Sequence, residues 1–126
     1  MRILAIFLAL RLFRSFGFKM VRDLSIQDFK AMRAGGDAYT LLDVRRDDEL
    51  ALAKYPEPYL HIEMSEVAAR LAEIPTDKPI IVACRSGGRS AKVAVLLQEK
   101  GFQNISNLTG GILAWAELDG ENACPI

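Results

Sequence analysis

An apolar stretch that runs directly into a glycine-rich loop constrains this chain of 126 residues more than any other feature. Residues 79–83 (PIIVA) are apolar throughout, as is typical of a central parallel strand that is buried on both faces. Cys84 follows, then Gly87 and Gly88, and then a segment with apolar residues at helical spacing. This order predicts an α/β domain in which Cys84 lies at the carboxyl edge of the sheet, where open α/β folds bind ligands.

The other segments alternate between strand and helix patterns, which predicts a parallel sheet with helices on both faces. Further strands are expected at residues 39–44, 60–62 and 105–108. Helices are expected after the N-caps Ser25 and Ser65, over residues 47–53, from Arg89 or Ser90 to Gly101, and over residues 112–118. In the segment after Ser65, residues Val67, Leu71 and Ile74 should share one face. We see no linker or repeat, so one domain is expected.

The loop after the central strand predicts a reactive thiol. Glycines allow successive backbone N–H groups to point inward, and the following helix adds its positive N-terminal end. A sulfur at the centre should have a depressed pKa, and the thiolate is the reactive form. Two other interpretations exist for Cys84: a small buried residue at a strand end, or a bystander in a phosphate-binding loop. Such a loop usually has Lys before Ser or Thr, which Arg89-Ser90 matches only loosely.

Composition narrows the classes of function. Lys+Arg and Asp+Glu both number 16, and the resulting net charge of zero argues against a nucleic-acid-binding protein. Two cysteines are too few for a disulfide framework, and a single histidine leaves a zinc site without partners. We therefore expect no metal and no cofactor. Free thiols suit a reducing compartment, so a cytoplasmic location is expected.

The first nineteen residues differ from the rest of the chain. Residues 3–10 are wholly apolar and are followed by Arg11, Arg14 and Lys19, but eight residues are too few to cross a bilayer, which takes roughly 20. Three interpretations remain for residues 1–19: an extension upstream of a domain at residues 20–126, an export signal, or an interfacial helix. Membrane contact is expected only through this segment.

Residues 84–90 (CRSGGRS) resemble the active-site loop of single-domain rhodaneses, the thiosulfate sulfurtransferases. Residues 41–45 (LLDVR) and residues 107–112 (NLTGGI), with Ala114 and Trp115, resemble two further signatures of that family. The three motifs occur in order within residues 22–126. The resemblance implies a single domain with a five-stranded parallel sheet and helices on both faces. The chain departs from the family at residues 54–59 (KYPEPY), where many members have Gly-His-Ile-Pro-Gly-Ala.

The resemblance also implies an activity. Cys84 would take sulfane sulfur from thiosulfate or a similar small anionic donor, hold it as a persulfide, and pass it to cyanide or a thiol. A relay module that serves a protein acceptor is the alternative. Cys-dependent phosphatases and arsenate reductases of the same fold family have five residues between Cys and Arg, whereas four separate Cys84 from Arg89, which favours sulfur.

The resemblance assigns roles within this loop. The predicted active-site residues are Cys84, Arg85, Ser86, Gly87, Gly88, Arg89 and Ser90, with Asp43 and Arg45 as supporting residues. Arg85 should attract an anionic donor, and Arg89 should brace the loop, for example against an acidic partner. Asp43 and Arg45 could equally form a structural ion pair. We interpret His61 as structural and Cys124 as an incidental thiol.

Overall fold

The computed structural model describes residues 21–119 and contains a five-stranded, fully parallel sheet in the order β1-β5-β4-β2-β3. The strands are β1 (Arg22–Leu24), β2 (Thr40–Asp43), β3 (Leu60–His61), β4 (Ile80–Ala83) and β5 (Ile105–Leu108). The expected α/β fold class is confirmed. The N-terminal extension at residues 1–19 and Cys124 lie outside the described residues, so the predictions made for them remain predictions.

Strand β4 occupies the centre of the sheet because its side chains are apolar on both faces. Successive residues alternate, so that Ile80 and Val82 enter one core while Ile81 and Ala83 enter the other. Each strand flanking β4 pairs with it through at least three registered positions. The residue after β4, Cys84, therefore emerges from the middle of the carboxyl edge.

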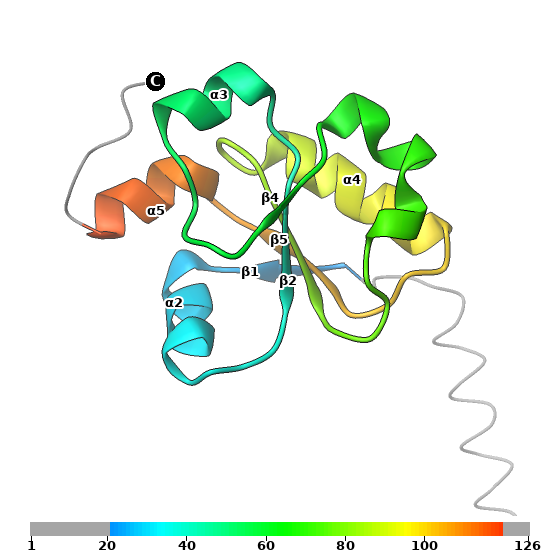
Figure 1. The fold of residues 1–126 in the computed structure, drawn as a ribbon. Helices are drawn as coiled ribbons and strands as arrows, with labels where there is room; N and C mark the ends of the chain where they lie inside the picture. The colour runs from blue at the N-terminus through cyan, green and yellow to red at the C-terminus, as the bar shows by residue number, and fades with distance from the viewer. Residues whose placement is uncertain (1–20, 120–126) are drawn as a thin grey trace, which may run out of the picture.

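Helices cover both faces of the sheet (Figure 1). The first core is covered by α4 (Gly88–Glu99) and two short 3₁₀ helices, η1 (Met64–Ala69) and η2 (Leu71–Glu73). The second core is covered by α2 (Ile26–Ala34) and α5 (Gly111–Asp119). Helix α3 (Asp47–Leu52) follows the carboxyl end of β2. Within residues 21–119, no helix has the length and apolar character that a membrane span requires.

The predicted cap at Ser65 is wrong. The cap at Ser25 forms, with the serine hydroxyl accepting a hydrogen bond from the Asp28 amide, but Ser65 caps nothing and lies inside η1. The Met64 amide is tied to the Val44 carbonyl at the edge of the sheet. A 3₁₀ helix rises about 2.0 Å per residue against about 1.5 Å in an α-helix, so it spans more distance with the same number of residues.

The interior face expected for this segment is nevertheless present. Val67 and Ile74 are buried in the first core, and Leu71 packs against it. The segment-by-segment prediction also missed β1, an edge strand of three residues with two exposed charged side chains. Because β1 lies at the edge of the sheet, pairs only with β5 and exposes two of its three side chains, its sequence shows no apolar pattern.

Candidate active site

The loop between β4 and α4 surrounds the sulfur of Cys84. The Sγ atom accepts hydrogen bonds from the backbone amides of Gly87 (3.1 Å) and Ser90 (3.4 Å). It also lies 3.3 Å from the Ser90 hydroxyl oxygen. The Ser90 amide belongs to the first turn of α4, where N–H groups have no carbonyl partner within the helix. The loop and the helix start thus direct donors at one atom.

Gly87 makes this curl possible. Its φ of +111° lies in the left-handed region, which side chains with a Cβ disfavour. Gly88 begins α4 with open space around its Cα, and the first intrahelical bond runs from the Ala91 amide to the Gly87 carbonyl. The helix therefore begins one or two residues earlier than the sequence predicted.

The donors change the acidity of the thiol. Burial raises the pKa of Cys84, whose exposed fraction is 1%, because burial disfavours the charged form. The Ser90 hydroxyl and the amides of Ser90, Gly87 and Ser86 act in the opposite direction and together outweigh burial. The net result is a pKa below that of an ordinary thiol, which favours the nucleophilic thiolate.

Donors from outside the loop bind the first two carbonyl groups of the loop, those of Cys84 and Arg85. The Cys84 carbonyl accepts hydrogen bonds from the Tyr55 hydroxyl (2.6 Å) and the Ile112 amide (3.0 Å). The Arg85 carbonyl accepts one from the Leu113 amide (3.2 Å). Both amides belong to the first turn of α5, so the N-termini of two helices, α4 and α5, support the loop from different sides.

The close approach of α5 to the loop explains why the second glycine of residues 107–112 (NLTGGI), Gly111, is needed. A Cβ at Gly111 would lie 2.3 Å from the Arg85 carbonyl oxygen and 2.6 Å from that of Cys84. The φ of Gly111 is also positive, at +58°. A glycine is therefore required where the C-terminal motif meets the cysteine loop.

Arg89 braces the loop, as expected, and its partner is acidic. Its guanidinium donates two hydrogen bonds of 2.7 Å to the carboxylate of Glu49 in α3. The hydrogen bond from Arg89 is the main reason that the pKa of Glu49 falls to about 2, against a smaller opposing effect of burial. The Arg46 amide donates a further bond to the same carboxylate.

Arg85 and Ser86 have no such role. The Arg85 side chain is half-buried, and among residues 21–119 it has no hydrogen-bond or ion-pair partner. Ser86 is exposed. Arg85 follows Cys84 directly in the chain, and its guanidinium has no acidic partner among residues 21–119.

Asp43 and Arg45 form a structural ion pair. Both side chains are fully buried, and the Arg45 guanidinium donates to both carboxylate oxygens at 2.8–3.1 Å. Burial lowers the pKa of Arg45, but the hydrogen bonds and charge of Asp43 outweigh it, so that the pKa is raised. Neither side chain has a hydrogen bond to the Cys84 sulfur in the described structure.

His61 also contacts this scaffold rather than the thiol. Its Nε2 lies 2.6 Å from the Arg45 carbonyl oxygen, and its Nδ1 lies 3.6 Å from the Asp47 carboxylate. The interpretation of His61 as a structural residue agrees with these contacts.

Three residues of the site were not recognised from the sequence: Glu49, Tyr55 and Asn107. Asn107 is buried, accepts a hydrogen bond from the Ser90 hydroxyl, and donates to the Gly87 carbonyl at 3.3 Å. Its place at the start of the NLTGGI motif was the only available signal. Glu49 and Tyr55 are 40 and 29 positions from their partners, and nothing in the local sequence points to either pairing.

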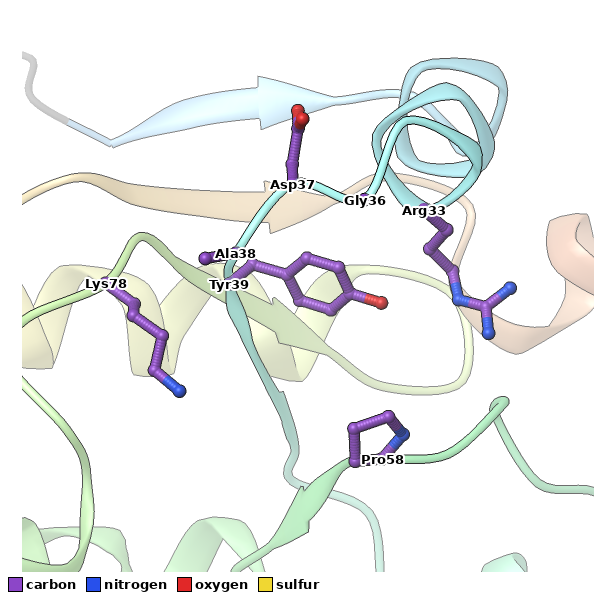
Figure 2. A pocket seen from close by; sticks show the side chains of 7 residues that line it. All are labelled: Arg33, Gly36, Asp37, Ala38, Tyr39, Pro58 and Lys78. Atoms are coloured by element: carbon purple, nitrogen blue, oxygen red, sulfur yellow. The ribbon is translucent and has the colours of Figure 1, made fainter.

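A separate pocket lies at the opposite edge of the sheet (Figure 2). It has a volume of about 250 Å³ and includes Tyr39 and Lys78, which precede β2 and β4 respectively. Because the strands are parallel, these amino ends lie away from the carboxyl edge that carries Cys84. The pocket contains no cysteine and is not part of the thiolate site.

Comparisons with known proteins agree with this architecture. The family model described as "Rhodanese-like domain" matches residues 25–118. The protein named "Sulfurtransferase" from Allochromatium vinosum is 33% identical over 97 residues, which cover 77% of this chain and 90% of that protein. The crystal structure of a rhodanese-related protein from Thermoplasma volcanium has a TM-score of 0.70 at 32% identity, over 80% of this chain and 95% of that one. A NAD-dependent persulfide reductase from A. fulgidus has a TM-score of 0.59 at 32% identity, over 73% of this chain and 15% of that one.

Proposed function

The chain belongs to the family of rhodanese-like domains, and from this membership we propose that it is a sulfurtransferase that carries sulfane sulfur on Cys84. The name of the Allochromatium vinosum relative supports sulfur transfer as the type of reaction, since the match covers nearly all of that protein. The observation that carries the proposal for Cys84 is the convergence of the Gly87 and Ser90 amides on its Sγ atom. We propose thiosulfate, or a similar anionic sulfane donor, as the substrate.

The first half of the proposed reaction loads the cysteine. The Cys84 thiolate attacks the outer sulfur of thiosulfate and forms a new S–S bond. The S–S bond within thiosulfate breaks, and its electron pair leaves with sulfite. Cys84 then holds a persulfide whose terminal sulfur carries the negative charge.

The second half of the proposed reaction removes the outer sulfur from Cys84. The acceptor, cyanide or a thiolate, attacks the terminal sulfur, and the electron pair of the Cys84 S–S bond returns to the cysteine. The products with cyanide are thiocyanate and the original thiolate, so atoms and charges balance over the cycle.

The loop suits both anionic states of the cysteine. Fixed amides that surround a negative charge stabilise it without reorganisation during the reaction. The amides of Gly87 and Ser90 bind the thiolate, and the positive end of α4 adds to the same effect. In this proposal the guanidinium of Arg85 attracts the anionic donor. The A. fulgidus protein is named as a persulfide reductase, which supports persulfide chemistry in proteins that contain this fold.

The decisive experiment supplies thiosulfate and cyanide to the purified protein and measures thiocyanate. Turnover should occur with the wild type and with Cys124→Ala, and should vanish with Cys84→Ala. Normal turnover by Cys84→Ala would refute the proposal. Hydrolysis of an aryl phosphate that depends on Cys84, with no thiocyanate formed, would identify a phosphatase instead.

The acceptor is a separate question within the same proposal. Both a free-standing enzyme and a protein relay would show an added mass of one sulfur atom after incubation with thiosulfate, lost on treatment with a reductant. Fast transfer of that sulfur to a protein thiol, with negligible transfer to cyanide, would favour the relay over the free-standing enzyme.

A further inference from the structure

Tyr55 connects the second core to the reactive cysteine. Its side chain is 2% exposed and belongs to the second core, together with Leu41 of β2 and Ile81 of β4. From there its hydroxyl donates a hydrogen bond of 2.6 Å to the carbonyl oxygen of Cys84, 29 residues away in the chain. The tyrosine lies in the segment between α3 and β3, within the stretch at residues 54–59 that departs from the family pattern.

This hydrogen bond acts on the peptide group at which the loop begins. The carbonyl of Cys84 accepts a second bond from the Ile112 amide, so both lone pairs of the oxygen are engaged. The peptide group that joins Cys84 to Arg85 is planar and trans, so its N–H points opposite to its C=O. Two donors on the oxygen therefore orient the whole peptide plane and turn the Arg85 N–H away from Tyr55 and α5.

The orientation of this plane matters for the amides that follow. The Gly87 amide reaches Sγ at 3.1 Å only three residues after Cys84, so a rotation at the first peptide group changes where the later amides point. A donor on the carbonyl also polarises the peptide group, which strengthens its N–H as a hydrogen-bond donor. Both effects favour a negative charge within the loop.

The ring of Tyr55 is itself held in place. The Arg45 guanidinium lies 5.2 Å from the ring centroid, a favourable cation–π distance. Arg45 is fixed by its buried ion pair with Asp43. Residues 41–45 (LLDVR), which include Asp43 and Arg45, therefore support the loop at Cys84 indirectly, by holding the Tyr55 ring.

We propose that Tyr55 is a positioning residue for the Cys84 thiolate and its persulfide, acting through the carbonyl of Cys84. This inference rests on the proposed function for its consequences in sulfur transfer, but its effect on the thiol can be measured without any sulfur donor. A tyrosine that only filled the core would support stability and leave the acidity of the thiol unchanged.

The test is Tyr55→Phe, which keeps the ring and removes the hydroxyl. The rate of alkylation of Cys84 by iodoacetamide, followed against pH at a temperature where the variant is folded, should show a midpoint raised by roughly half a unit to one unit, the equivalent of one net hydrogen bond. At pH values below the wild-type midpoint, the rate of persulfide formation from thiosulfate should fall about threefold to tenfold, and it should recover as the pH is raised. Recovery is expected because the variant thiol also ionises at higher pH.

Two comparisons make the test specific. Tyr39→Phe makes the same change at the opposite edge of the sheet and should leave the midpoint at its wild-type value. Replacement of Tyr55 by 4-aminophenylalanine keeps an N–H donor at the para position and should restore the midpoint, which a role in core packing alone would not predict.

The outcomes separate the two proposals. A folded Tyr55→Phe variant with the wild-type alkylation midpoint would overturn the role of Tyr55. A raised midpoint together with a wild type that accepts no sulfur would refute the sulfurtransferase and leave the positioning role intact. If Tyr55→Phe does not fold, replacement of Tyr55 by 3-fluorotyrosine decides, because its hydroxyl is a stronger donor: a midpoint below the wild-type value would support the proposal, and an unchanged midpoint would count against it.

Discussion

Glu49 accepts two hydrogen bonds of 2.7 Å from the guanidinium of Arg89, across 40 positions of the chain. The pair joins α3 to the first turn of α4, and so ties the segment after β2 to the loop that holds Cys84. The Glu49 side chain is 8% exposed, whereas Arg89 retains partial access to solvent. A carboxylate this buried needs its partner, because an unpaired charge away from water is strongly unfavourable.

Removing the charge of Glu49 should therefore destabilise the fold. We expect Glu49→Gln to lower the free energy of unfolding by on the order of 2 kcal/mol at neutral pH, measured by urea denaturation. Glu66→Gln is the matched control, since Glu66 pairs with Arg70 at the same 2.7 Å but is 52% exposed. Exposed pairs contribute little, so the control should change stability far less. Equal effects of the two substitutions would show that burial of the Glu49 pair is unimportant.

The same pair predicts an acid dependence. The pKa of Glu49 is about 2 in the folded protein, below the roughly 4.3 of an unpaired glutamate in an unfolded chain. Its stabilising contribution is complete above the unfolded pKa and is lost as the pH falls through the folded one. The difference in stability between wild type and Glu49→Gln should thus be constant near neutrality and shrink between about pH 4 and pH 2. A difference that persists unchanged at the acid end would contradict this assignment.

The lowered pKa of Cys84 should affect both the rate of its alkylation and the pH dependence of the protein's stability. Because its folded pKa is lowered, the midpoint of alkylation by iodoacetamide against pH should lie below the roughly 8.5 of a free thiol. A depressed pKa contributes stability that is complete above the unfolded value of roughly 8.5 and is lost as the pH falls through the folded value. The stability of wild type relative to Cys84→Ala should therefore rise with pH between those two values. An alkylation midpoint at that of a free thiol would refute the preorganised loop.

Substitutions of the two arginines of the loop, Arg85 and Arg89, should change different measured quantities. Arg85→Ala should raise the apparent KM for thiosulfate about threefold to tenfold, with a smaller change in the thiol pKa, because its charge acts on the incoming anion. The effect should shrink at high salt, which screens such attraction. Arg33→Ala, at the opposite edge of the sheet, is the control and should leave KM unchanged. Arg89→Ala should chiefly lower the melting temperature, through loss of the pair with Glu49. A KM for Arg85→Ala equal to that of wild type would remove Arg85 from the substrate site.

Gly111 provides a steric test of how the loop is supported. In Gly111→Ala the new Cβ would overlap the Arg85 carbonyl, in addition to the strain of a positive φ. We expect severe destabilisation, of several kcal/mol, or failure to fold, since neither backbone segment can move without breaking its hydrogen bonds. Gly36→Ala isolates the strain, because Gly36 has a φ of +77° and open space around it, and should cost only about 1 kcal/mol. Similar melting temperatures for the two variants would show that the close approach of α5 to the loop is not rigid.

Local patterns sufficed for the fold class and for the position of Cys84 at the carboxyl edge of the sheet. The apolar run at residues 79–83 and the helical spacing after Gly88 are properties of adjacent residues, so they predict β4, α4 and the loop between them. The N-cap at Ser25 was predicted for the same reason. Where the local signal was weak or misleading, the prediction failed, as in the charged edge strand β1 and the supposed cap at Ser65.

The contacts that support the loop around Cys84 depended on the tertiary structure. The sequence alone determined that Cys84 leaves a buried strand and enters a loop able to aim its amides at the sulfur. The arrival of Tyr55, Glu49 and Asn107 at that loop from 17 to 40 positions away required the order β5-β4-β2, which places the segments after β2 and in β5 on either side of Cys84. Strand order is set by how whole faces pack and how connections cross the sheet, and these are free-energy terms shared by distant residues rather than by neighbours in the chain.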